Sequence, residues 1–320
     1  MLLRMDDAAD LPLVTVTIPT WNRLMLLREA VASVVAQAYP RWELVISDDG
    51  STDGSAAWVR GLGDPRIRVV EGAHTGHIGR VRNTGVAAGT GELLAFLDSD
   101  DLWYPHTLAV MVEGLTAAGT SWLYGDAELI DARGETIPMP ARGRPPVGGW
   151  VKREVLAMEV GVFVGGLLVR RELFERVGRF SEDPRLVLRG DLELAIRLAM
   201  HAPAAAIPYV VSRVRHHPHR TTGRQDDGHA RTALVYTLFL EGRPPRDLAR
   251  VARSCRARHL AASAARRLAR GEYAAGARLV ARAFADRPLS RHWLGALVRG
   301  VRGRLAARGE GRGGAVDSPR

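Results

Sequence analysis

Apolar runs and helical periodicities alternate through the first 118 residues. Leu13–Ile18 is apolar and rich in β-branched residues, and it stops at Pro19, which is typical of a buried parallel strand. Leu24–Gln37 carries apolar side chains at helical spacing and is predicted to form an amphipathic helix. Further strands are predicted at 43–47, 67–70 and 93–97, and further helices at 55–61, 81–88 and 105–118. This alternation, with short connections, predicts an α/β fold with a mostly parallel sheet flanked by helices.

Polar clusters follow three of the predicted strands, at 19–23, 48–53 and 98–101. In open α/β sheets, ligands bind outside the carboxyl ends of the strands. We therefore expect the three clusters to meet at one edge of the sheet, although tens of residues separate them in the sequence.

The second half of the chain has a less regular pattern. Residues 138–149 are dense in Pro and Gly and are predicted to be a loop. Residues 163–169, which include Gly165 and Gly166, resemble a strand or a closely packed backbone segment. Helices are predicted at 170–177 and 191–201, and the Ala- and Arg-rich chain after Gly228 is predicted to be all-helical.

Composition and charge separate the body of the chain from its last part. The 320 residues are 46% hydrophobic and 25% charged, as in a soluble protein with one large domain and an appendage, or two modest domains. Residues 230–320 hold 20 Arg against 6 acidic residues, whereas the rest of the chain is slightly acidic. A basic segment favours anionic partners such as lipid headgroups or nucleic acid. Compositional drift is the alternative, because Lys152 is the only lysine.

The sequence also favours a cytoplasmic location. Cys255 is the only cysteine, so no intrachain disulfide is expected, which fits a reducing compartment. The acidic N-terminal residues lack the apolar stretch of a signal peptide. The longest apolar run, Val155–Val169, is interrupted by Glu159 and is too short to cross a bilayer.

The run Asp98-Ser99-Asp100-Asp101 after an apolar strand is the strongest chemical signal. Its carboxylates repel one another, and a divalent cation with a preference for hard oxygen ligands, Mg²⁺ or Mn²⁺, would lower that cost. A diphosphate leaving group needs such neutralisation. The alternative is a solvated acidic turn in which Asp101 caps the next helix. Taken alone, the motif does not decide between the two.

Three weaker signals accompany this run. Asp49 could accept hydrogen bonds from a nucleobase imide or a ribose, or belong to an Asp-Gly turn. Asp191 could cap a helix or act as a general base. His217 is one of three histidines in four positions and could bind a metal or a phosphate.

Residues 13–222, about two thirds of the chain, resemble the family 2 glycosyltransferases, which have the Rossmann-like GT-A fold. The matching segments occur in the family's order and at about its spacing. They are VTVTIPTWNR (14–23), VASVVAQAYPRWELVISDDGSTDGS (31–55), RNTGVAAGTGELLAFLDSDDLWYP (82–105), VGRFSEDPRLVLRGDLELAIRL (177–198) and RVRHHPHRTT (213–222).

The resemblance implies a role for each matching residue on the donor side. Pro19, Trp21 and Asp49 fall where the family holds the donor nucleobase. Asn22, Arg23 and Arg82 lie close to that site. Asp98 and Asp100 match the DXD motif, so Asp100 would hold a Mn²⁺ or Mg²⁺ ion that bridges the diphosphate, and Asp98 would lie near the ribose or the metal.

The acceptor side follows in the same way. Asp191 matches the catalytic base, and His217 matches a histidine that approaches the metal or the diphosphate in some members. Gly165 and Gly166 fall in the region that borders the acceptor. Most relatives carry Glu-Asp where this chain has Gly190-Asp191, so Asp191 is the only carboxylate in that motif.

These roles imply a domain organisation. We expect a GT-A domain at 11–228, with a nucleotide-sugar half at 11–125 and an acceptor half at 126–228. A basic helical extension would follow at 229–308 and a disordered tail at 309–320.

The predicted activity is inverting transfer of a sugar from a nucleotide-diphosphate donor to a hydroxyl group. UDP- or dTDP-sugars are favoured, because a carboxylate suits a uracil or thymine imide, and a GDP-sugar stays open. The acceptor would be a saccharide, a lipid-linked glycan or a natural product. No nucleic acid partner is expected, and the basic extension would contact the anionic inner face of the cell membrane.

Two alternatives remain at this level. A non-catalytic sugar-nucleotide-binding module would keep Asp49 and Asp100 without needing Asp191. A sugar nucleotidyltransferase would carry a Gly-rich loop with a basic residue after the first strand, which residues 19–23 lack.

Overall fold

The computed structural model describes residues 10–138, 145–216 and 227–288. The chain divides into two compact units, residues 1–223 and 224–320. His217, the expected tail at 309–320 and the end of the expected helical extension lie outside the described residues.

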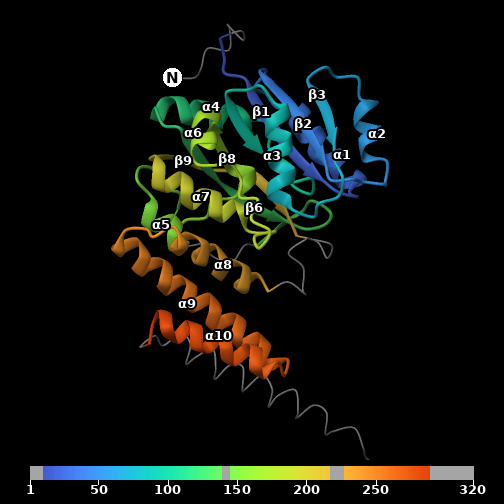
Figure 1. Cartoon of the computed structure of the whole chain (residues 1–320). Coiled ribbons are helices and arrows are strands. Elements are labelled where there is room, and N and C mark those ends of the chain that lie inside the picture. The colour runs from blue at the N-terminus through green and yellow to red at the C-terminus, as the bar shows by residue number, and fades with distance from the viewer. Residues whose placement is uncertain (1–9, 139–144, 217–226, 289–320) are drawn as a thin grey trace, which may run out of the picture. The chain divides into compact units, whose positions relative to one another are not determined.

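The first unit is built on one mixed sheet with helices on both faces (Figure 1). The strand order is β3-β2-β1-β4-β8-β6-β9-β5, with β7 paired to β6. The strands are β1 (Val14–Thr20), β2 (Trp42–Asp48), β3 (Ile67–Glu71), β4 (Leu93–Phe96), β5 (Leu102–Trp103), β6 (Trp122–Ile130), β7 (Thr136–Ile137), β8 (Leu167–Arg170) and β9 (Ala204–Arg215).

The strands β3, β2, β1 and β4 run parallel, as the alternation of strands and helices predicts. The register places Thr20, the last residue of β1, opposite Asp48, the last residue of β2. The polar clusters that follow these strands therefore start at the same edge of the sheet.

The other half of the sheet mixes directions. Strand β8 runs antiparallel to both β4 and β6, and β6 runs parallel to β9. The segment 163–169 contains a short 3₁₀ turn, η1 (Val164–Gly166), followed by β8, so both forms expected for it occur.

Helices cover the parallel strands on both faces. The apolar sides of α1 (Leu24–Val35) and α4 (Thr107–Ala118) pack in one core cluster with Val14, Val16 and Ile18 of β1. The alternate residues Thr15 and Thr17 face α3 (Ile78–Ala88), where Gly85 permits close approach. The unit's other helices are α2 (Ser55–Arg60), α5 (Lys152–Leu156), α6 (Arg171–Arg176) and α7 (Gly190–His201).

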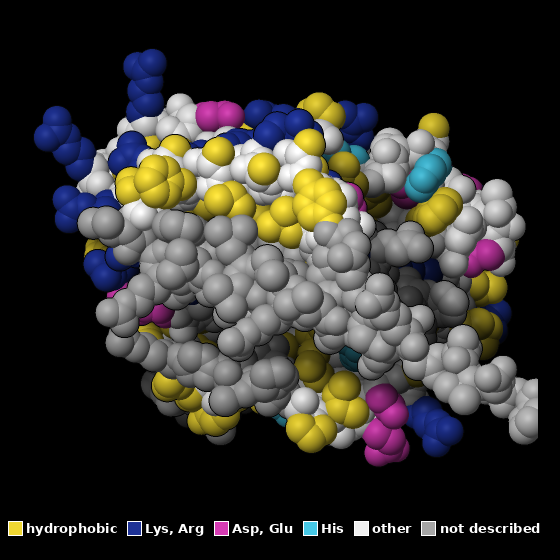
Figure 2. Space-filling model, turned by 90° about the horizontal axis from the view of Figure 1, so that it is seen from below, with side chains coloured by type: hydrophobic (Ala, Val, Ile, Leu, Met, Phe, Trp, Pro, Cys, Tyr) yellow, Lys and Arg dark blue, Asp and Glu magenta, His cyan; other side chains and the backbone are white. Residues whose placement is uncertain are grey.

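The described part of the second unit is helical, with α8 (Gly228–Glu241), α9 (Arg246–Ala269) and α10 (Tyr273–Asp286). Its small core consists mainly of alanines, and Arg256 of α9 forms two hydrogen bonds of 2.7 and 2.6 Å with the carboxylate of Asp286. Tyr273 and Phe284 of α10 are each 48% exposed. A view from below shows apolar side chains exposed near Lys and Arg side chains (Figure 2). No helix within the described ranges is long and apolar enough to cross a membrane.

Candidate active site

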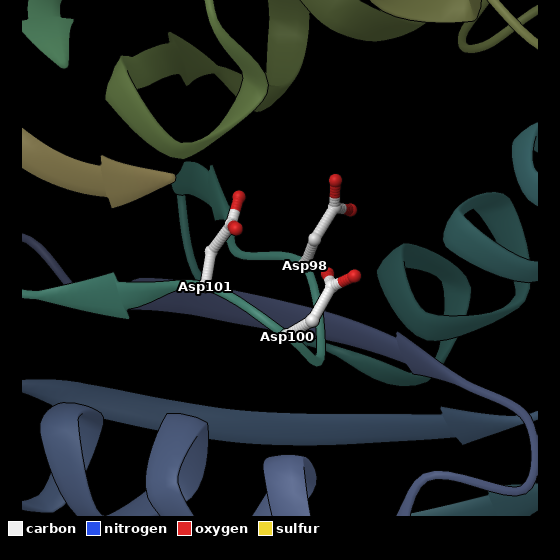
Figure 3. Close-up of side chains that lie close together, drawn as sticks. All are labelled: Asp98, Asp100 and Asp101. Atoms are coloured by element: carbon white, nitrogen blue, oxygen red, sulfur yellow. The ribbon is translucent and has the colours of Figure 1, made fainter. Parts of the chain in front are cut away.

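Three carboxylates converge just beyond the end of β4. The chain leaves the strand at Phe96 and turns at Asp98, Asp100 and Asp101, where the backbone N–H of Asp101 donates to the carbonyl of Asp98 over 3.1 Å. One oxygen from each of the three carboxylates lies within 4.8 Å of the others. Figure 3 shows the three side chains rising from this loop with their carboxylates on one side. Hard oxygen donors at this spacing suit a divalent cation such as Mg²⁺ or Mn²⁺.

Two arginines from other elements pair with this cluster. Arg23, just before α1, places Nη1 2.6 Å from Oδ2 of Asp100, and Arg82 of α3 places Nη2 2.6 Å from Oδ1 of Asp98. The Arg82 side chain is only 6% exposed. Its Nε is buried and has no hydrogen-bond partner in the described part of the chain. A buried unpaired donor is costly, so this atom is suited to an anion that enters from outside.

Arg215, the last residue of β9, also binds the acidic loop. Its backbone N–H donates to Oδ1 of Asp101 over 2.8 Å, and its Nε donates to the carbonyl of Asp100 over 3.0 Å. The same guanidinium donates to the carbonyl of Ala132 and pairs with Glu29 of α1. The alternative in which Asp101 caps the next helix is wrong, because α4 starts only at Thr107 and the Asp101 carboxylate accepts from the backbone N–H of Arg215 in β9.

The segment after β1 is tied to the loop after β2. Pro19 lies near the end of β1, and Asn22 has a left-handed backbone with φ of 51°. The Asn22 N–H donates to Oγ of Ser51 over 2.9 Å, and its Oδ1 accepts from the N–H of Thr52 over 2.8 Å. Since Arg23 comes next and reaches Asp100, the segment 19–23 connects the loop after β2 to the acidic cluster.

Asp53 holds the start of α1 beside Arg23. Its carboxylate accepts from the N–H of Leu24 over 2.8 Å and from the N–H and hydroxyl of Ser55. Burial alone would raise the pKa of Asp53, but these hydrogen bonds outweigh it and lower the pKa below its usual value. Asp53 therefore stays ionised and keeps this end of the helix in place.

Asp49 is buried directly after β2. Its Oδ1 accepts from the N–H and hydroxyl of Thr75, and its Oδ2 accepts from the N–H of Gly76 over 2.8 Å. His74 places Nδ1 2.9 Å from the same Oδ2, and its ring stacks on Trp21 with centroids 4.2 Å apart. His74 is not among the residues predicted from the sequence, because a histidine in a polar loop carries no signal of the distant residues it contacts.

Asp191 lies in the first turn of α7, where its Oδ1 accepts from the N–H of Leu192 over 2.9 Å. The cap position belongs to Arg189, whose φ of 74° is left-handed, so the capping role considered for Asp191 is not the observed one. A Cβ on Gly190 would lie 3.8 Å from Phe180, and the guanidinium of Arg82 lies 5.1 Å from the Phe180 ring. Phe180 thus links the start of α7 to the arginine that pairs with Asp98.

Gly165 and Gly166 lie against β9 and β6. A Cβ on Gly165 would come within 2.4 Å of Ser212, and one on Gly166 within 2.8 Å of the Gly125 carbonyl. The Gly165 carbonyl accepts from Nε1 of Trp103 over 2.7 Å. Both glycines therefore permit close backbone packing next to the segment that follows the acidic loop.

Comparison with known proteins gives one family match and several relatives. A family model described as Glycosyl transferase family 2 matches residues 15–178. The chain is 32% identical over 127 residues to the UDP-Glc:alpha-D-GlcNAc-diphosphoundecaprenol beta-1,3-glucosyltransferase WfgD of Escherichia coli, which covers 40% of this chain and 49% of that protein. The chain spans about half the length of the curated relatives it matches.

Solved structures match a larger share of the chain. The structure of Staphylococcus aureus TarS 1-349 in complex with UDP aligns with a TM-score of 0.68 and 16% identity, over 96% of this chain and 94% of that one. The mannosyltransferase PcManGT of Pyrobaculum calidifontis, in complex with GDP-Man and Mn²⁺, aligns with a TM-score of 0.58 and 21% identity, over 97% and 90%. These similarities show a shared fold and confirm the expected GT-A architecture.

Proposed function

Because this chain belongs to glycosyl transferase family 2, we propose that it is a glycosyltransferase that transfers a sugar with inversion from a nucleotide-diphosphate donor to a hydroxyl acceptor. The observation that carries this proposal is the acidic cluster, where oxygens of Asp98, Asp100 and Asp101 lie within 4.8 Å of one another. Two arginines from separate elements border the cluster, and guanidinium groups are suited to binding the oxygens of a diphosphate.

The residues of the cluster fit a divalent ion. The donor set consists of carboxylate oxygens, which Mg²⁺ and Mn²⁺ prefer, and Asp100 and Asp98 would be the ligands. A bound ion would neutralise the negative charge that develops on the departing nucleoside diphosphate. The complex of PcManGT with GDP-Man and Mn²⁺ supports this choice. His217, which lies outside the described residues, is proposed as a further ligand.

Residues around the cluster would bind the rest of the donor. Arg23 and Arg82 can each give one N–H to a diphosphate oxygen, and the buried Nε of Arg82 is a donor suited to that purpose. Asp98 would also approach the ribose. Trp21, Pro19 and Asp49 would hold the nucleobase, and Asn22 would keep their loops together through Ser51 and Thr52.

Asp191 would act as the general base. Its carboxylate accepts the proton of the acceptor hydroxyl while that oxygen forms a bond to the anomeric carbon. The bond from the anomeric carbon to the diphosphate oxygen breaks at the same time, and its electron pair leaves with the nucleoside diphosphate. Attack from the face opposite the leaving group inverts the configuration. Gly165 and Gly166 would border the acceptor, since both lie next to the segment that follows the acidic loop.

The proposed donor is a UDP- or dTDP-sugar, and the proposed acceptor is a saccharide or a lipid-linked glycan. WfgD, as its name states, uses UDP-Glc and a diphosphoundecaprenol-linked sugar, which supports both choices. The 20 Arg of residues 230–320 would then favour peripheral contact with an anionic membrane at the cytoplasmic face.

Donor hydrolysis tests the proposal. The protein is incubated with Mn²⁺ and a panel of UDP-, dTDP- and GDP-sugars, and release of the nucleoside diphosphate is measured. We expect slow release that disappears in Asp100→Ala and persists in Asp64→Ala. Asp64 is a suitable control because its ion pair with Arg66 lies just before β3, at the start of the parallel strands, whereas the cluster follows the end of β4. Pyrophosphate release from a nucleoside triphosphate and a sugar phosphate would instead support a nucleotidyltransferase. Donor binding without turnover, with every acceptor tried, would support a binding module.

A further inference from the structure

His74 combines two contacts that are typical of a bound nucleobase. It lies in the loop between β3 and α3, its side chain is 46% exposed, and its ring stacks on Trp21 at an interplanar angle of 20°. Its Nδ1 lies 2.9 Å from Oδ2 of Asp49 and 3.1 Å from the Asp49 carbonyl oxygen. Because both neighbours are acceptors, Nδ1 must carry the hydrogen and donate it.

The Asp49 carboxylate has no remaining acceptor position for another donor. A carboxylate has about four lone-pair sites, and four donors already approach this one: the N–H and hydroxyl of Thr75, the N–H of Gly76, and Nδ1 of His74. A ligand that is to bond Asp49 must therefore displace one of them.

The His74 ring is the donor that can leave most easily. The loop backbone is fixed, because the N–H of Gly72 donates to the Asp48 carbonyl over 2.9 Å. Gly50, with φ of 78°, packs so closely that a Cβ there would lie 2.9 Å from the backbone N of His74. The half-exposed imidazole needs only a side-chain rotation, whereas release of Thr75 and Gly76 would require the loop itself to move.

We propose that His74 occupies the nucleobase position in the ligand-free protein and that the base of the donor displaces it. The imidazole is an aromatic heterocycle, stacked on Trp21, with a ring N–H directed at Asp49. The imide edge of a uracil or thymine offers the same two contacts. The inference rests on the proposed function, since it assumes a nucleotide donor, and it makes His74 a residue that sets donor affinity and selectivity.

Displacement has a measurable cost. If His74 occupies the base position in most molecules of the free protein, the apparent dissociation constant for the nucleotide is raised above the intrinsic one. The factor is the inverse of the fraction of molecules in which His74 has left that position. Removal of the imidazole removes this competition. We expect His74→Ala to bind UDP about fivefold more tightly than the wild type, with a lower KM for the donor and an unchanged kcat. Inorganic pyrophosphate has no base, so its affinity should not change.

Isothermal titration with Mn²⁺ tests this, using UDP, dTDP, GDP and inorganic pyrophosphate as ligands for the wild type and His74→Ala. His201→Ala is the matched control, because His201 is also exposed and bonds only its own helix, at the far end of α7 from Asp191. Tighter binding of one or more nucleotides in His74→Ala alone, with pyrophosphate unchanged, supports the proposal. Weaker or equal nucleotide binding overturns the proposal and leaves the transferase function intact, because His74 would then line the site without competing with the nucleobase. If no nucleotide binds to any form, the proposed function and this inference both fall.

A second measurement needs no variant of uncertain stability. In NMR spectra of the ligand-free protein, stacking on Trp21 should shift the His74 ring protons upfield, and saturating UDP should return them toward free-imidazole values. Resonances that remain shifted with UDP bound would contradict displacement, whatever the calorimetry shows.

Discussion

The two ends of the sheet in the first unit both carry acidic side chains paired with arginine, but they use them differently. At the amino end of the parallel strands, one carboxylate, that of Glu43, accepts hydrogen bonds from several strands and loops. At the carboxyl end, three carboxylates converge on one another, and each paired arginine comes from a different element. The difference separates a carboxylate that stabilises the fold from carboxylates that are arranged to bind a ligand.

Both oxygens of the Glu43 carboxylate bind groups of the protein itself. Its Oε1 accepts from the hydroxyl of Thr15 over 2.7 Å and from the N–H groups of Thr90 and Gly91, and its Oε2 pairs with Arg68 over 2.7 Å. Burial alone would raise the pKa of Glu43, but the hydrogen bonds outweigh it and lower the pKa to about 2. Donors of the protein therefore already occupy the acceptor positions that a ligand would need.

The cluster of Asp98, Asp100 and Asp101 is held in a different way. Its loop is held by two backbone groups, the Asp100 carbonyl and the N–H of Asp101, and each carboxylate accepts from an arginine. One oxygen of each carboxylate nevertheless lies within 4.8 Å of the others. Mutual repulsion of these oxygens is a cost for the fold. The carboxylates at this end should therefore matter for turnover more than for stability, and Glu43 should show the reverse.

The largest effect on turnover is expected for Asp191→Asn. The amide cannot accept the acceptor's proton, so kcat should fall by about 10²- to 10⁴-fold, the usual contribution of a general base. Affinity for UDP should stay within about twofold, because Asp191 does not touch the nucleotide in the proposed arrangement. Steady-state transfer kinetics and UDP titration measure the two quantities.

Glu193→Gln is the control for that variant. Glu193 lies in the same first helical turn and pairs with Arg197, so the substitution changes the helix charge equally without touching the proposed base. A loss of kcat in Glu193→Gln as large as that in Asp191→Asn would mean that the helix terminus, and not the carboxylate of Asp191, matters.

A smaller effect is expected for Arg215→Lys. Lysine keeps the charge near Glu29 but cannot reach the carbonyls of Asp100 and Ala132 together. The acidic loop should loosen, and the Mn²⁺ affinity should fall by about tenfold, at the lower end of the range for residues that orient metal ligands. Donor hydrolysis measured against Mn²⁺ concentration reports the change.

Arg213→Lys provides the comparison on the same strand. The Arg213 side chain pairs with Glu128 over 3.0 Å and donates to the Gly134 carbonyl, and neither partner belongs to the acidic loop. If both variants shift the Mn²⁺ dependence alike, Arg215 has no particular role in positioning the cluster.

The sequence predicted the parallel half of this fold well, because its signals are local. Apolar β-branched runs and helical spacing identify β1, α1 and β4 within a few residues. The topology rule then predicts that the loops after these strands share an edge, and Asn22 and Arg23 do connect those loops. The family resemblance is confirmed by the match over residues 15–178.

The strands of the second half of the sheet could not be predicted from local patterns. Strand β9 contains Pro208, and its pairing with β6 shifts register between Gly125 and Asp126, so neither strand shows clean alternation. His74 and Arg215 were missed for another reason. Their contacts with Asp49 and Asp100 span 25 and 115 residues, and no local pattern encodes such pairs.

The smallest effect on turnover, and the largest on stability, is expected for Glu43→Gln. The pKa of Glu43 falls from 4.5 to about 2 on folding, which corresponds to about 3 kcal/mol of stability at neutral pH. Because the folded-state pKa is the lower one, this contribution is complete above pH 4.5 and is lost as the pH falls toward 2.

Glutamine resembles the protonated acid at every pH. The free energy of unfolding of Glu43→Gln should therefore lie about 3 kcal/mol below the wild type at pH 7, and the difference should shrink as the pH falls below 4.5. Urea titrations at several pH values measure it, and kcat per folded molecule should stay unchanged. A pH-independent difference would mean that Glu43 contributes through packing and not through its charge, and the contrast between the two ends of the sheet would no longer rest on ionisation.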